Sequence, residues 1–140
     1  LTFCAGSFSA GEHNDCVSMA KQFADRTHFV HLRSCYIFPN GNFTEASHLG
    51  GRGHLIELCR IFEKAEQEGK CNSGRRLPMR VDHGMTFTDE PGGVFDESNH
   101  GHNAGYTLLG RMFAMGQIQG VIATVDDELG IEYKQPGFYD

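Results

Sequence analysis

The sequence predicts part of a parallel α/β fold, namely about three strand–helix units of a (β/α)8 TIM barrel. Strand-like and helix-like segments alternate along the 140-residue chain, and the loops after the strands are longer than the turns after the helices. Polar side chains occupy one face of each strand, which favours a barrel mouth over an open sheet whose strands are usually apolar on both faces. Because a closed barrel needs eight units and about 250 residues, three units form only part of one.

The first unit begins with a strand over residues 1–4, whose alternation places Cys4 on the polar face. We expect a polar loop over residues 5–13 to follow. Asn14 or Asp15 then supplies the side-chain acceptor that caps the first turn of a helix. The apolar stripe of this helix, which we expect to run to about residue 26, consists of Val17, Ala20, Phe23 and Ala24.

The second unit begins with a strand over residues 28–33, which carries His31 on its polar face. A long loop over residues 36–53 separates this strand from the next helix. That helix is predicted over residues 54–68, and Gly69 is placed where a glycine commonly ends a helix. Its buried stripe is predicted to be Leu55, Leu58, Ile61, Phe62 and Ala65.

The third unit begins with a strand over residues 77–83, which sends Arg80 and Asp82 to the same face. A second long loop follows over residues 84–105. The third helix is predicted over residues 106–124, and it contains three glycines, so its stability should depend on close packing. Its apolar residues are Leu109, Phe113, Ile118, Val121 and Ile122.

Composition excludes several classes of partner. The net charge of −6 and the pI near 5.7 argue against a nucleic-acid surface, which is normally basic. The longest apolar runs fall far short of the roughly 20 residues of a membrane span, and the start does not resemble a signal peptide. Five scattered cysteines without a C-x-x-C motif indicate reduced thiols and a cytoplasmic protein.

Each predicted strand delivers one candidate metal ligand near its C-terminal end: Cys4, His31 and Asp82. A thiolate, an imidazole and a carboxylate together can bind a divalent transition metal. Each residue also has an ordinary alternative role. Cys4 can instead be a small buried thiol that binds no metal. His31 can instead be a histidine of the core that is satisfied by hydrogen bonds. An interior Asp82 can instead form an ion pair with Arg80 or Arg33.

Five segments, in the same order along the chain, match one known family: LTFCAGS (1–7), FVHLR (29–33), FTEASHLG (43–50), RVDHG (80–84) and NAGYTLLGR (103–111). Together they resemble the C-terminal third of mannonate dehydratase, a member of the xylose-isomerase-like barrel superfamily. The resemblance implies that the chain supplies strands six to eight of the barrel. Residues 1–125 would then be the C-terminal units of the catalytic domain, and residues 126–140 an irregular tail.

The resemblance implies a hydro-lyase of hexuronate catabolism that converts D-mannonate to 2-dehydro-3-deoxy-D-gluconate with Mn²⁺ or Fe²⁺, as a homodimer. It implies Cys4, His31 and Asp82 as metal ligands, together with a further histidine upstream of Leu1. Without that ligand and the other strands, we expect the 140-residue portion to be inactive by itself. The alternative from a different reaction class is a metal-dependent sugar isomerase or epimerase of the same superfamily. A thiolate ligand favours the dehydratase.

The remaining candidates concern proton transfer and substrate binding. The resemblance implies that His83 and Tyr106 transfer protons, without deciding which is the acid and which the base. Histidine suits this role because its pKa lies near neutrality. Arg33, His48 and Arg111 are candidates to bind the substrate, since an arginine fork matches a carboxylate; Glu45 and Ser47 belong to the same loops. Their alternative role is that of ordinary loop or helix polar residues.

Overall fold

The computed structural model describes residues 1–87 and 105–132, and its elements follow the predicted alternation with several short additional elements. Their order along the chain is β1 (Thr2–Cys4), α1 (Ala5–Ser9), α2 (Cys16–Phe23), η1 (Ala24–Arg26), β2 (Phe29–Leu32), β3 (Cys35–Ile37), β4 (Phe43–Glu45), α3 (Leu55–Gln67), η2 (Asn72–Gly74), β5 (Met79–Val81) and α4 (Leu108–Leu129).

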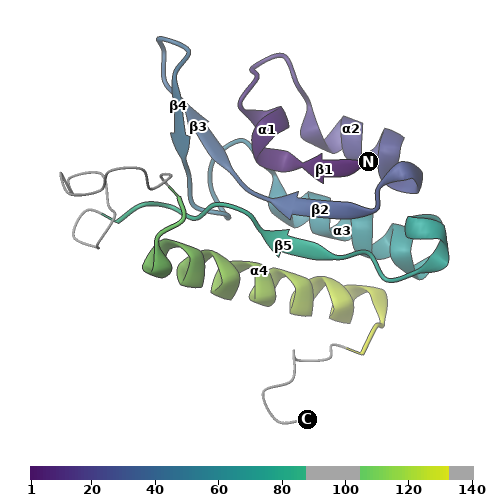
Figure 1. Cartoon of the computed structure of the whole chain (residues 1–140). Helices are drawn as coiled ribbons and strands as arrows, with labels where there is room; N and C mark the ends of the chain where they lie inside the picture. Colours follow the sequence, from purple (N-terminus) through teal and green to yellow (C-terminus); the bar gives the residue numbers. More distant parts are fainter. Residues whose placement is uncertain (88–104, 133–140) are drawn as a thin grey trace.

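The three predicted strands form one parallel sheet in the order β1-β2-β5, so the predicted parallel pairing is confirmed. The arrows of all three strands point the same way in Figure 1, and the β3–β4 hairpin stands at the end where they finish. Cys4 is in register with His31, and His31 with Arg80. Because side chains alternate along a strand, these three residues and Asp82 share one face of the sheet.

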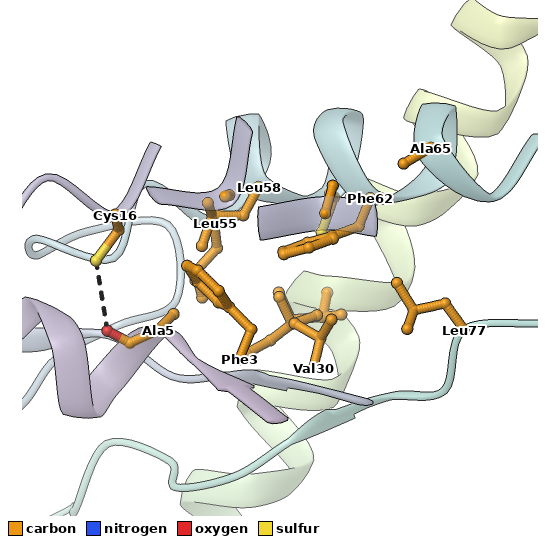
Figure 2. Close-up of a cluster of buried hydrophobic side chains, with 14 of the residues drawn as sticks. Phe3, Ala5, Cys16, Val30, Leu55, Leu58, Phe62, Ala65 and Leu77 are labelled. Atoms are coloured by element: carbon orange, nitrogen blue, oxygen red, sulfur yellow. Dashed lines mark hydrogen bonds between the residues drawn. The ribbon is translucent and has the colours of Figure 1, made fainter. Parts of the chain in front are cut away.

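The opposite face of the sheet is apolar and is covered by helices α2 and α3 (Figure 1). Phe3 and Val30 project from β1 and β2 toward Leu58 and Phe62 of α3, as Figure 2 shows. The rings of Phe3 and Phe62 meet edge to face at 5.2 Å. The two faces of the sheet therefore differ, because one is packed into the core while the other carries the polar residues.

Two local signals in the sequence behave as predicted. Asp15 is the cap of α2, and its side chain accepts hydrogen bonds from the backbone of Val17 and Ser18, both at 3.0 Å. Gly69 adopts a φ of 65° directly after α3, a conformation that favours glycine and ends the helix. Helix α3, which Gly69 ends, buries most of its predicted apolar stripe. Ile61 is the stripe residue that is only partly buried.

Two segments predicted as loops are regular structure instead. Residues 5–9 form the short helix α1, whose small residues Ala5, Gly6 and Ser9 are buried against the sheet. The loop predicted over residues 36–53 contains the antiparallel β3–β4 hairpin. Its turn is stabilised by Gly41, which has a φ of 84°, and by a side-chain oxygen of the adjacent Asn40.

Helix α4 is longer than predicted, since it continues to Leu129. Gly130 ends it with a φ of 68°, and the last turns bury Val125 and Asp126. The irregular tail predicted from residue 126 is therefore wrong for its first four positions, 126–129. The predicted close packing holds at Gly110, where a Cβ would overlap the carbonyl oxygen of Met85.

One face of α4 is exposed and apolar. Gly116 and Gly120 meet no atom within 4 Å of a built Cβ, so the predicted close packing does not extend to them. Leu109 and Phe113, predicted as apolar residues of this helix, are both exposed. By length and composition alone α4 also qualifies as a membrane-crossing helix, with a mean hydropathy of 1.2 over its best window. One such helix is weak evidence, and α4 packs along β5 and α3.

The contact between α3 and α4 buries two carboxyl groups, Glu63 at 6% exposure and Asp126 at 4%. Burial, reinforced by the charges of Asp126 and Glu66, raises the pKa of Glu63 to about 7. Within the described part of the chain, Oδ1 of Asp126 has no hydrogen-bond partner. Ionising this pair should therefore destabilise the fold.

We expect Glu63→Gln to stabilise the protein at pH 8 and to have little effect at pH 4. The folded pKa of Glu63 lies above its ordinary value of 4.5, so the unfolded chain ionises first and wild-type stability falls between about 4.5 and 7. The expected gain at pH 8 is on the order of 2 kcal/mol. Urea denaturation at both pH values measures it, with the surface variant Glu68→Gln as control. An equal gain at both pH values would contradict the ionisation argument.

Candidate metal centre

The structure brings the three predicted ligands together at the C-terminal ends of β1, β2 and β5. One ligand atom from each of Cys4, His31 and Asp82 lies within 4.8 Å of the other two. Cys4 Sγ is 3.9 Å and His31 Nδ1 is 3.7 Å from Oδ2 of Asp82. We call these three residues the ligand cluster. The register of the parallel strands produces it, since each strand adds one residue to the same sheet face.

The chemistry of the ligand cluster fits a divalent transition metal. Metal bonds of roughly 2.0–2.3 Å place donor atoms roughly 3–4 Å apart, which is the spacing around Asp82 Oδ2. A thiolate with an imidazole favours metals such as iron or zinc over magnesium and calcium, which prefer oxygen ligands, while the carboxylate of Asp82 also suits manganese. Three protein ligands also leave positions open for another ligand and a substrate. Ser7 supports the cluster by donating a hydrogen bond to Cys4 Sγ at 3.2 Å.

Asp82 serves two sets of partners through its two oxygens. Oδ1 accepts a hydrogen bond from Arg80 at 2.6 Å and lies 3.4 Å from the Tyr106 hydroxyl. Oδ2 faces the ligand cluster and lies 3.8 Å from His83 Nε2. The ion pair considered from the sequence is therefore present, and it leaves the oxygen at the cluster available.

Burial alone would raise the pKa of the Asp82 carboxyl. The hydrogen bond from Arg80 and the nearby His31 and His83 outweigh that effect, and together they hold the pKa below its ordinary value. Asp82 is consequently ionised across the neutral range, which is the form that binds a cation.

The two residues predicted to transfer protons lie beside the ligand cluster. Their rings meet edge to face with centroids 4.4 Å apart. His83 is nearly buried, while Tyr106 is partly exposed at the start of α4. Both approach Asp82, His83 through Nε2 and Tyr106 through its hydroxyl. The structure thus places both residues that the sequence predicts to transfer protons next to the ligand cluster.

The three predicted substrate-binding residues differ in position. Arg111 lies with its guanidinium 5.4 Å from the centroid of the Tyr106 ring, next to the predicted acid–base pair. Arg33 is engaged elsewhere, because it donates to both carboxylate oxygens of Glu45, at 2.9 and 2.5 Å.

His48 is not part of the site surface. Its side chain is only 2% exposed, and burial lowers the pKa of its ring. Nε2 lies 2.8 Å from the carbonyl oxygen of Leu32, so it donates there, and the backbone amide of His48 donates to Gln117. These contacts anchor the loop before α3 to β2 and α4. The geometry therefore gives no support to substrate binding by His48.

Sequence reasoning missed the contact between Glu45 and His83. The sequence places Glu45 only in a loop near the substrate, whereas its Oε1 lies 3.0 Å from His83 Nδ1. Glu45 belongs to β4, whose pairing with β3 was not predicted. The Asn40-Gly41 turn was the signal in the sequence that would have indicated that hairpin.

These observations define a class: part of a parallel α/β domain with a candidate divalent-metal centre at the carboxyl ends of its strands, where such folds place their active sites. The family model described as D-mannonate dehydratase (UxuA) matches residues 1–131, and the chain belongs to this family.

Similar proteins agree with this membership. Mannonate dehydratase 2 of Agrobacterium fabrum is 37% identical over 131 residues, which cover 92% of this chain and 31% of that protein. Mannonate dehydratase of Saccharophagus degradans is 37% identical over 128 residues, 90% of this chain and 31% of the relative. The chain thus spans about a third of the length of these curated relatives.

A solved structure shares the fold. The crystal structure of mannonate dehydratase from Streptococcus suis serotype 2 superposes on this chain with a TM-score of 0.69 at 19% sequence identity. The superposition covers 100% of this chain and 38% of the solved one. At this level of identity the likeness describes the fold alone.

Proposed function

We propose that the protein carrying this chain is a hydro-lyase that converts D-mannonate to 2-dehydro-3-deoxy-D-gluconate with bound Mn²⁺ or Fe²⁺. The observation that carries the proposal is the ligand cluster of Cys4, His31 and Asp82 beside His83 and Tyr106. In this proposal the chain supplies strands six to eight of a TIM barrel in a cytoplasmic homodimer that acts in hexuronate catabolism. Family membership supports the choice of reaction.

Dehydration removes the proton on the carbon next to the substrate carboxylate and expels the neighbouring hydroxyl group as water. A divalent ion held by the ligand cluster would stabilise the negative charge that develops on the carboxylate. Because its pKa is lowered, the Asp82 carboxyl remains ionised and can bind that ion.

His83 and Tyr106 divide the two proton transfers. One group accepts the carbon-bound proton while the other donates a proton to the leaving hydroxyl, so that water departs and an enol forms. The enol then rearranges to the 2-keto acid. The available atoms are Nε2 of His83 and the phenolic hydroxyl of Tyr106, both of which face Asp82. Arg111, next to Tyr106, is placed to bind the substrate carboxylate.

The test is a dehydration assay on the full-length protein that carries this chain. It contains D-mannonate and Mn(II), with a chelator control and mass-spectrometric detection of the 2-keto-3-deoxy acid. We expect product that depends on metal, and none from the 140-residue chain alone. Stoichiometric bound metal without this product would overturn the dehydratase proposal, and interconversion of sugars by the same sample would favour an isomerase.

A further inference from the structure

We propose that Glu45 is a positioning residue that fixes the tautomer of His83, so that Nε2 is the ring nitrogen presented to the substrate. Glu45 Oε1 and His83 Nδ1 are 3.0 Å apart, and the two side chains are 9% and 10% exposed. The kinetic part of this inference rests on the proposed dehydratase function, while the structural part does not.

Which of the two groups carries the proton at this 3.0 Å approach follows from the third member of the network, Arg33. Its guanidinium donates to both oxygens of Glu45 and cannot be deprotonated in a protein. Glu45 is therefore an ionised acceptor with no proton to offer. The hydrogen between Glu45 Oε1 and His83 must belong to Nδ1, and the neutral ring then carries its lone pair on Nε2.

This tautomer matters because of where each ring nitrogen lies. Nδ1 faces the β3–β4 hairpin through Glu45, whereas Nε2 lies 3.8 Å from Oδ2 of Asp82. With the proton of the neutral ring held at Nδ1, any proton that His83 accepts or donates during the reaction moves at Nε2, on the side of the ligand cluster. The opposite tautomer would place the lone pair toward Glu45 and repel its carboxylate.

Close packing holds the network in one arrangement. A Cβ built on Gly105, which has a φ of 90°, would lie 2.8 Å from His83 Nδ1 and 3.0 Å from Glu45 Cγ. A Cβ on Gly6 would overlap the side chain of Arg33, whose guanidinium also lies 5.7 Å from the centroid of the Phe43 ring. Arg33, predicted from the sequence to bind substrate, thus acts through Glu45.

The direct test is the tautomer of His83 in the wild-type, full-length protein. Two-bond ¹⁵N–¹H correlation spectra of ¹⁵N-histidine-labelled, chelator-treated protein distinguish Nδ1–H from Nε2–H. The pH should be about 8.5, above the ordinary imidazole range. His83 is assigned by its absence from the spectrum of His83→Asn. We expect the Nδ1–H form, and an Nε2–H form in the wild type overturns the proposal whatever the variants do.

The second test replaces Glu45 by glutamine, whose amide can present either an acceptor or a donor to Nδ1. We expect a mixture of tautomers and a kcat about 10- to 100-fold lower, with KM changed less than about threefold. Glu45→Asp keeps the charge and should recover part of the activity. The control is Glu128→Gln, which removes an exposed glutamate that also binds an arginine through two bonds, Arg60 at 2.8 and 3.0 Å. It should leave tautomer and kcat unchanged.

The outcomes separate this inference from the proposed function. Wild-type kcat together with a wild-type tautomer in Glu45→Gln overturns the inference, as does a fall in kcat without any change in tautomer. If the wild type dehydrates no D-mannonate yet shows the Nδ1–H form, the reaction assignment fails while the positioning of His83 stands.

Discussion

Asp82→Asn is expected to abolish stoichiometric binding of the divalent metal and to lower turnover of D-mannonate on the order of a thousandfold. Asp82 provides the only carboxylate of the ligand cluster, and its oxygen Oδ2 faces the other two members. A neutral amide is a much weaker ligand, and a bound metal contributes several kcal/mol of charge stabilisation in such reactions. Metal content by elemental analysis and the dehydration assay measure the two effects.

Two further variants make this prediction sharper. Cys4→Ser keeps the size of the side chain but removes the thiolate, so it distinguishes a metal ligand from a small buried thiol. It should lose metal as well. Asp25→Asn is the control, because Asp25 is exposed in η1, before β2, at the other end of that strand. Full metal content in both Asp82→Asn and Cys4→Ser would contradict the assignment of the cluster.

The parallel sheet and the cluster could be predicted because they depend on local patterns that repeat. Alternation along each strand decides which face a residue occupies. Parallel register then places Cys4, His31 and Arg80 side by side, and Asp82 follows two residues after Arg80 on the same face. The caps at Asp15 and Gly69 are likewise local. Such features require no knowledge of what else packs against them.

The remaining features depend on tertiary contacts. Glu45 meets His83 only because the β3–β4 hairpin stands over the end of the sheet, which no periodicity in the loop indicated. His48 resembled an exposed loop residue, yet Leu32 and Gln117 from two other elements bury it. The exposed apolar residues of α4 show the same limit, since burial depends on neighbours that a helical pattern does not specify.

His83→Asn and Tyr106→Phe are each expected to lower kcat about a hundred- to ten-thousandfold, the range for loss of a general acid or base. Neither variant should reduce metal content. Neither residue is a member of the ligand cluster, and Arg80 still holds Oδ1 of the Asp82 carboxylate. Asparagine keeps a polar group at position 83, and phenylalanine keeps the ring that packs there.

The double variant tests whether the two residues act in one step. If His83 and Tyr106 complete the same proton transfers, each is ineffective without the other, so the double variant should be little slower than the slower single variant. Tyr36→Phe, an exposed tyrosine of β3, is the matched control and should keep wild-type kcat. Turnover near the wild-type value in both single variants would end the acid–base assignment. Metal loss in either variant would instead make its residue part of the metal centre, which would move proton transfer to a group outside this pair.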